Sequence, residues 1–202
     1  MKKLEFWFDF GSPNSYFAYK VLPEIEARLG VNFARKPALL GGVFKATGNQ
    51  SPFFAYANIP AKMDYTRREI MRFVRHHGLV DFNMNPHFPV NTLLAMRGAA
   101  AADIAGELDR YMDCVMKAMW EDGKKTDDPE VLLTALADAG LDADYYREKV
   151  GDADVKAALM ATTQEAIDRG MFGVPTFFVG GEMFFGKDSL AAVEKEIALQ
   201  RR

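Results

Sequence analysis

The sequence predicts an α/β fold in which both ends of the chain build one sheet and an all-helical domain is inserted between the two halves. The first 40 residues are typical of strand, helix and strand, and strand character returns from Thr176 onward. Between about residue 45 and about residue 170 the strand signals nearly vanish. Because neither terminal segment alone can bury both faces of its strands, we expect the two segments to meet in a single sheet.

The N-terminal segment has the pattern of a strand–helix–strand unit. Apolar side chains recur with a period of two over residues 4–10, which predicts the first strand. From Ser15 the apolar spacing becomes helical and continues to Gly30, a residue type that commonly ends helices. Residues 31–36 then indicate a second strand, and a unit of this length favours parallel pairing with a right-handed crossover.

The middle of the chain predicts helices. The expected helices are Lys62–His77, Val90–Ala102, Ile104–Trp120, a segment that starts with an acidic cap before Pro129 and ends at Gly140, and Asp154–Arg169. We therefore expect a sheet-containing domain made of residues 1–45 and 166–202, and an inserted helical domain made of residues 46–165.

The C-terminal segment predicts a hairpin followed by a helix. Residues 176–179 and 182–185 have strand composition and flank Gly180-Gly181, which predicts a two-residue hairpin turn. Asp188 is a candidate N-cap for a last helix over residues 189–199.

Composition and charge exclude several classes of protein. Of 202 residues, 49% are hydrophobic and 26% are charged, so the chain can bury a sizeable core. The net charge is −3 and charges of both signs are interspersed, so we expect no nucleic-acid partner. No run approaches the roughly 18 apolar residues of a membrane helix, so we expect no membrane association.

Two features indicate a cytoplasmic protein. Glu5 and Asp9 interrupt the first apolar run and no small-residue cleavage site follows, so this segment predicts a strand rather than a signal peptide. Cys114 is the only cysteine, which rules out an internal disulfide and fits a reducing compartment. Its helical surroundings predict a buried thiol that serves packing.

Ser12 lies where a strand, a turn with a proline and a helix follow one another. Thiol–disulfide enzymes carry Cys-x-x-Cys in this context, but here Ser12 and Ser15 take the two cysteine positions, so no disulfide can form. A hydroxyl at a helix N-terminus can donate a hydrogen bond to a thiolate that a ligand brings, and the helix dipole adds to that stabilisation. The alternative is that Ser12 is only a helix N-cap.

Pro175 directly precedes the first strand of the predicted hairpin. One interpretation is an ordinary trans proline at a strand entry. The other is a cis proline that faces the N-terminus of the first helix and offers the backbone of Val174 to a peptide-like ligand. The combination with the Ser12 segment favours the second interpretation.

These motifs, taken together, resemble one family. The segments FDFGSPNSY, LLGGVFKATGN and FGVPTFFVGGEMFFGKDSL, with a helical insertion between them, resemble the 2-hydroxychromene-2-carboxylate isomerases and the closely similar kappa-class glutathione transferases. The matching motifs cover residues 6–17, 39–49 and 172–190, with a short FPVN at residues 88–91. The resemblance implies a thioredoxin-like fold with an inserted helical domain. Gly11 departs from the pattern, since many relatives are expected to carry a bulkier residue there.

The resemblance implies glutathione as the cofactor and Ser12 as the catalytic group that stabilises its thiolate. Val174, beside Pro175, would pair with the peptide backbone of glutathione, and Lys187 and Asp188 would bind its γ-glutamyl end. The residues implied to bind glutathione are Ser12, Asn49, Lys62, Val174, Pro175, Lys187 and Asp188. Without the family, Asn49 is a turn residue and Lys62 an exposed cation. Lys45, in the same loop as Asn49, is a candidate contact for a substrate carboxylate.

The function that we expect is glutathione-dependent cis–trans isomerisation of a small aromatic carboxylate of the 2-hydroxychromene-2-carboxylate kind, by reversible thiolate addition, bond rotation and elimination. One alternative is a kappa-class transferase or peroxidase that consumes glutathione, and another is a non-catalytic thioredoxin-like binding module. The relatives imply a homodimer. His76, His77 and His87 have no companion ligands at zinc-like spacing, so we expect no metal.

Overall fold

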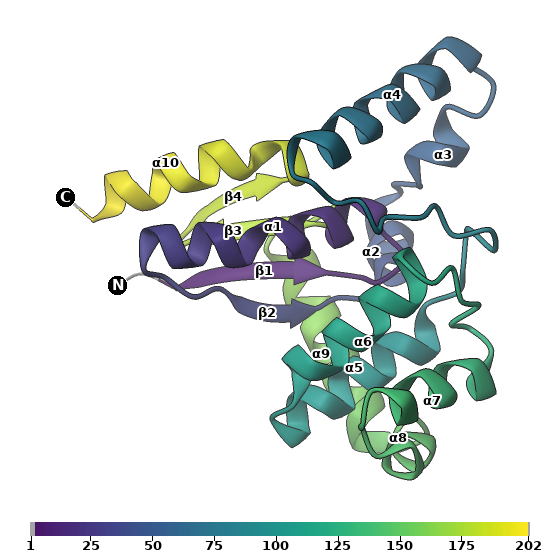
Figure 1. Ribbon diagram of the computed structural model, residues 1–202. Helices are drawn as coiled ribbons and strands as arrows, with labels where there is room; N and C mark the ends of the chain where they lie inside the picture. The colour runs from purple at the N-terminus through teal and green to yellow at the C-terminus, as the bar shows by residue number, and fades with distance from the viewer. Residues whose placement is uncertain (1–2, 202) are drawn as a thin grey trace.

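The computed structural model describes residues 3–201, and in this part of the chain four strands form one sheet (Figure 1). The strands are β1 (Leu4–Phe8), β2 (Ala34–Pro37), β3 (Thr176–Val179) and β4 (Glu182–Phe185), in the order β2-β1-β3-β4. β1 pairs with β2 in parallel and with β3 antiparallel, and β3 pairs antiparallel with β4. The two ends of the chain therefore share one sheet, and this prediction is confirmed.

Helices make up most of the remaining chain. α1 (Pro13–Leu29) connects β1 to β2, and α10 (Leu190–Gln200) follows β4 after a short 3₁₀ helix, η1 (Lys187–Ser189). The helices between β2 and β3 are α2 (Leu40–Thr47), α3 (Pro52–Ala55), α4 (Pro60–His76), α5 (Leu93–Ala105), α6 (Leu108–Trp120), α7 (Pro129–Asp138), α8 (Ala143–Lys149) and α9 (Ala153–Asp168). None of the helices within residues 3–201 is long and apolar enough to cross a membrane.

The predicted middle helices are confirmed to within a few residues at their ends, whereas α2, α3 and α8 are additional. In Figure 1, α5 to α8 gather in one block beside the sheet, and α3 and α4 project from the same end of the sheet in another direction. The division into a sheet-containing domain and an inserted domain at residues 46–165 stays a prediction.

The central strands β1 and β3 are buried on both faces, which explains why they are rich in aromatic residues, whereas the edge strand β4 is largely exposed. Phe6 of β1 and Phe177 of β3 stack with ring centroids 5.4 Å apart, in a core that also contains Phe17 of α1 and Val193 of α10. Trp7 and Phe178 are buried together in a second cluster, which contains Ala166 of α9. Since neighbouring side chains of a strand point to opposite faces, α1 and α10 cover one face of the sheet and α9 covers the other.

The ends of several helices follow their sequence signals. α1 ends at Gly30, whose φ of 60° lies in the left-handed region that favours glycine. Asp128 caps α7 as expected and accepts a hydrogen bond from the Glu130 N–H at 3.0 Å. The prediction that Asp188 caps the last helix is wrong, because the chain first forms η1 and Ser189 is the N-cap of α10.

α2 corrects the expectation that Lys45 lies in a loop. Its N-cap, Leu39, makes no side-chain capping bond. Distant residues supply acceptors instead: the Leu40 N–H donates to Asp9 Oδ2 at 2.7 Å, and the Leu39 N–H donates to Thr163 Oγ1 at 3.0 Å. A helix that is capped from other segments leaves no local signal at its start.

Gly98 and Gly41 provide a matched test of how α5 packs against α6. A Cβ atom at Gly98 in α5 would lie 1.9 Å from the Tyr111 hydroxyl oxygen, whereas a Cβ at Gly41 in α2 would have no atom outside its own helix within 4 Å. We expect Gly98→Ala to lower the free energy of unfolding by about 1–3 kcal/mol through overpacking. Gly41→Ala should raise it by about 0.4–1 kcal/mol, because alanine reduces the entropy of the unfolded chain. Urea unfolding of both variants measures this, and equal effects would contradict the packing of α5 against α6.

Candidate functional site

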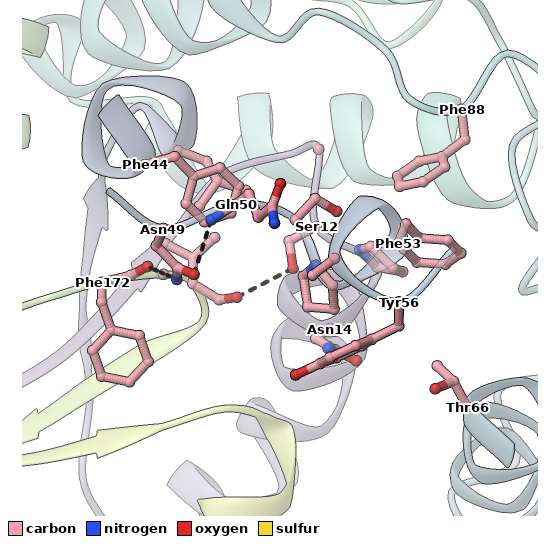
Figure 2. Close-up of a pocket in the computed structure, with 18 of the residues that line it drawn as sticks. Ser12, Asn14, Phe44, Asn49, Gln50, Phe53, Tyr56, Thr66, Phe88 and Phe172 are labelled. Atoms are coloured by element: carbon pink, nitrogen blue, oxygen red, sulfur yellow. Dashed lines mark hydrogen bonds between the residues drawn. The ribbon is translucent and has the colours of Figure 1, made fainter. Parts of the chain in front are cut away.

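A cavity of about 320 Å³ opens at the N-terminus of α1 (Figure 2). This volume falls in the range of about 300–1,000 Å³ that is usual for small-molecule sites. Six aromatic residues line it: Phe44, Phe53, Tyr56, Phe88, Phe172 and Phe185. Glu69 is the one carboxylate among its lining residues within the described chain, and no Lys or Arg lines it. The cavity is therefore largely apolar, with a few polar groups near Ser12.

Ser12 is the N-cap of α1 and lines this cavity, with 7% of its surface exposed. Its Oγ accepts a hydrogen bond from the Ser15 N–H at 3.2 Å and donates one to the Val174 carbonyl at 3.3 Å. The second bond, dashed in Figure 2, joins parts of the chain 162 positions apart. Ser12 is thus an N-cap and also a hydroxyl donor whose present bond is long and therefore weak.

Val174 presents its backbone to the same cavity. The Val174–Pro175 peptide bond is cis, which confirms that expectation. The Val174 N–H has no hydrogen-bond partner among residues 3–201, although the residue is only 6% exposed. Nearly all buried backbone groups are paired, so this N–H beside the cavity is available to an acceptor from a ligand or from water.

The start of α1 offers a second unpaired donor. Pro13 has no N–H, and the Asn14 N–H has no partner within the described residues. The first N–H groups of a helix lack acceptors inside it, and they carry the positive end of the helix dipole. Asn14 lines the cavity next to Ser12 (Figure 2), so this N–H and the Ser12 hydroxyl can stabilise one anion together.

Asn49 lies in the cavity wall that the α2–α3 connection forms. Its Nδ2 donates to the Phe172 carbonyl at 2.7 Å, and its Oδ1 accepts from the Gln50 N–H at 2.9 Å. These bonds, visible in Figure 2, tie the connection to the segment before Pro175. Lys62 is absent from the lining, but its ammonium lies 3.2 Å from the ring centroid of Tyr56, which does line the cavity.

Lys187 and Asp188 line a different hollow, beside α1 and α4. The Lys187 side chain is 1% exposed, and its ammonium bonds Glu69 and, at 2.7 Å, Asp188. Glu69 borders the main cavity, so it connects the two places. The predicted γ-glutamyl contacts are therefore adjacent to the cavity of Ser12, and the Lys187 ammonium is already engaged.

The structure does not bring Lys45 to Ser12. Leu40 and Phe44 of α2 line the main cavity, whereas Lys45 lines a separate hollow between α2, α5 and α9. The helical period explains the difference, since adjacent residues of a helix point in different directions. Because the sequence indicates a loop in this segment, it does not predict that Phe44 and Lys45 point into different hollows.

The aromatic wall is the main feature that the sequence left unassigned. Phe53 and Phe88 lie with ring centroids 4.8 Å apart, and both line the cavity. Buried aromatics are usual in any core, so their spacing alone does not distinguish them from packing residues. Within residues 3–201, no group of three or more His, Cys, Asp or Glu side chains could hold a metal ion.

Comparison with known proteins places these features in a family context. The family model of DSBA-like thioredoxin domains matches residues 3–198. The chain is 28% identical to 2-hydroxychromene-2-carboxylate isomerase of Pseudomonas sp. (strain C18), over 96% of this chain and 89% of the relative. It is 26% identical to glutathione S-transferase kappa 1 of Homo sapiens, over 94% of this chain and 88% of that protein.

Solved structures agree with the same assignment. A structure of 2-hydroxychromene-2-carboxylate isomerase matches with a TM-score of 0.84 and 26% identity, covering 98% of this chain and 96% of that chain. A probable DsbA oxidoreductase from Streptomyces coelicolor shares the fold, with a TM-score of 0.75 at 18% identity and coverage of 98% and 91%. The resemblance and the thioredoxin-like fold that the motifs predict are confirmed.

The single protein thiol should be unreactive. Cys114 is buried in α6 and its Sγ donates to the Ala135 carbonyl at 3.2 Å. Burial raises the pKa of this thiol to about 11, so at pH 8 it is protonated and a poor nucleophile. We expect a disulfide reagent such as 5,5′-dithiobis(2-nitrobenzoic acid) to label it slowly at pH 8, and rapidly once urea unfolds the chain. Fast labelling of the folded protein would show that Cys114 is accessible.

Proposed function

This chain belongs to the family of DSBA-like thioredoxin domains, and we propose that it is a glutathione-dependent isomerase of small aromatic carboxylates. Relatives named 2-hydroxychromene-2-carboxylate isomerase and glutathione S-transferase kappa 1 support an enzyme of this type. The observation that carries the proposal is a hydroxyl, Ser12, in place of a nucleophilic thiol, directly beside the unpaired N–H of Val174. The thiol must then come from a ligand with a peptide backbone.

In the proposed mechanism, ligand binding first changes the hydrogen bond between Ser12 and Val174. A ligand peptide that pairs antiparallel with Val174 accepts from its N–H and donates to its carbonyl. That carbonyl currently accepts from Ser12, at 3.3 Å. Because this bond is long and weak, the Ser12 hydroxyl exchanges it for a bond to the ligand sulfur when the ligand N–H bonds the same carbonyl. Binding of the backbone and stabilisation of the thiolate are coupled in this way.

The remaining residues bind and orient. Bound glutathione supplies a thiol whose reversible addition to a conjugated carbon makes a double bond rotatable. Ser12 and the Asn14 N–H hold the sulfur as the anion, and charge-assisted bonds of this kind are stronger than neutral ones. The γ-glutamyl group lies towards Glu69, whose carboxylate meets its ammonium, and Lys187, which bonds Glu69 and Asp188, supports this end of the ligand from the adjacent hollow. Asn49 and Lys62 contact the opposite side of glutathione.

The substrate's ring occupies the aromatic wall beside Ser12. Phe53 and Phe88 offer faces for stacking at this wall. Its carboxylate meets a neutral donor, the side-chain amide of Gln50, which also lines the cavity. Lys45 lies outside this cavity and is not part of the proposed substrate site.

Product analysis tests the proposal against its alternatives. The purified protein is incubated with cis or trans aromatic 2-oxo acids and one equivalent of glutathione. The two isomers are separated by chromatography, and each isomer and the glutathione are quantified by mass spectrometry. Isomerised substrate with all glutathione recovered supports the isomerase. A glutathione conjugate or glutathione disulfide indicates a kappa-class transferase or peroxidase instead. Absence of glutathione binding by calorimetry would refute both enzyme functions and leave the binding module.

Cytoplasmic location and a homodimer stay predictions.

Ser12→Ala should preserve the fold and impair the chemistry. A hydrogen bond to a charged group contributes about 1.5–3 kcal/mol. One pKa unit corresponds to about 1.4 kcal/mol, so the pKa of the bound thiol should rise by about one to two units. At neutral pH activity should fall about ten- to a hundredfold, and raising the pH should restore part of it. Thiolate absorbance of bound glutathione against pH measures the shift.

S-Methylglutathione serves as the control ligand because it keeps the backbone and lacks the thiol. We expect Ser12→Ala to bind it with unchanged affinity, since the Val174 backbone is intact. Coincident thiolate titrations for wild type and variant would show that Ser12 is only a helix cap.

A further inference from the structure

Asp9 is a buried carboxyl group directly before the turn that carries Ser12. Its side chain is 0% exposed, and no Lys, Arg or His within residues 3–201 pairs with it. Aspartate is almost never fully buried unless it is paired, because burial of an acidic group costs free energy. Its position at the end of β1 therefore needs a reason beyond packing.

The contacts of Asp9 join three segments of the chain. Oδ1 accepts from the Gly11 N–H at 2.8 Å, within the turn that precedes Ser12. Oδ2 accepts from the Leu40 N–H at 2.7 Å, at the first residue of α2. The Thr92 hydroxyl, at the N-cap of α5, is a third partner. The Gly11 turn and Leu40 both border the cavity, so one carboxyl group spans two of its walls.

The geometry of these hydrogen bonds explains why the residue is an aspartate. Two backbone N–H groups from different segments approach the two oxygens of one short side chain. Asparagine has the same shape but one acceptor oxygen, so its amide nitrogen would face one of the two N–H donors. Burial raises the pKa of Asp9, and its hydrogen bonds from Leu40, Gly11 and Thr92 oppose that rise. In either protonation state both oxygens can accept.

We propose that Asp9 is a positioning residue of the thiolate site, which holds the turn before Ser12 at a fixed place relative to the α2 wall. This inference rests on the proposed function. A hydroxyl that stabilises a thiolate has to be held within about 0.5 Å of its productive place. The carboxyl of Asp9 is the side chain that connects the Ser12 turn to the opposing wall, and it never contacts the ligand itself.

Gly11 supports the same inference. A Cβ atom there would lie 3.1 Å from Thr92 Cγ2 and 3.3 Å from Asp9 Oδ1. The grouping of Asp9 and Thr92 around this turn leaves little room for a side chain. This accounts for glycine at the position where the family resemblance leads us to expect a bulkier residue.

Asp9→Asn tests the inference. Loss of one backbone bond should displace the turn, so the pKa of bound glutathione's thiol should rise by about one unit and kcat at neutral pH should fall about tenfold. The affinity for S-methylglutathione should stay close to that of wild type, because Val174 is unchanged. An unchanged thiol pKa and kcat would overturn the inference, even if the melting temperature falls.

Asp128→Ala is the control for lost stability. Asp128 also accepts from two backbone N–H groups, those of Glu130 and Val131, but both bonds are made to Oδ1, at the start of α7 and away from the cavity. Asparagine would keep that oxygen, whereas alanine removes the cap, so this variant should lose stability and keep the thiol pKa. If Asp9→Asn does not fold, Leu40→Pro removes the N–H that donates to Asp9 Oδ2, at a first helical position where proline is tolerated. A raised thiol pKa there supports the inference and an unchanged one overturns it. The thiolate titration of wild type separates this inference from the proposed function. If bound glutathione shows no lowered thiol pKa in wild type, the proposed function itself is refuted.

Discussion

The antiparallel pairing of β1 with β3 is the constraint on which the rest of the structure depends. It runs from Leu4 opposite Val179 to Trp7 opposite Thr176, and so closes a loop that contains nearly the whole chain. Closing so long a loop costs entropy, but the cost grows only slowly with length. Burial of aromatic side chains on both faces of these strands offsets it, with Phe6 stacked on Phe177 on one face and Trp7 near Phe178 on the other. Because both strands lead directly into the site, their register decides that Ser12 meets Val174.

Several of the site's donors are groups that other thioredoxin-like surfaces could also offer, namely a helix N-terminus and the backbone before a proline. In this chain, several of these donors lack a strong partner. The N–H groups of Val174 and Asn14 are unpaired within residues 3–201, and the Ser12 hydroxyl has only a long bond to a carbonyl. The one thiol, Cys114, does not line the cavity, since it is buried in α6 and bonded to Ala135. An arrangement of donors without a nucleophile fits an anion that arrives with a ligand.

Sequence patterns predict the parts of this molecule whose signals are local. The period of β1, the stop of α1 at Gly30 and the hairpin at Gly180-Gly181 follow from neighbouring residues, and the structure agrees. α2 did not follow, since it contains two glycines and takes its capping acceptors from Asp9 and Thr163. The same limit applies to the site. Ser12 and Pro175 are visible as motifs, whereas the role of Phe53 and Phe88 depends on how distant helices pack.

The same long-range contacts make the helical segments part of the site's support as well as its wall. The turn at residues 9–11 is held by Leu40 of α2 through Asp9, and by Trp120 of α6, whose Nε1 donates to the Phe10 carbonyl at 2.8 Å. Both bonds are made to a segment that ends in Ser12, so a displacement of α2 or α6 moves the hydroxyl as well as the cavity wall. Changes among these helices that adapt the cavity to a different substrate therefore act on the position of Ser12 at the same time.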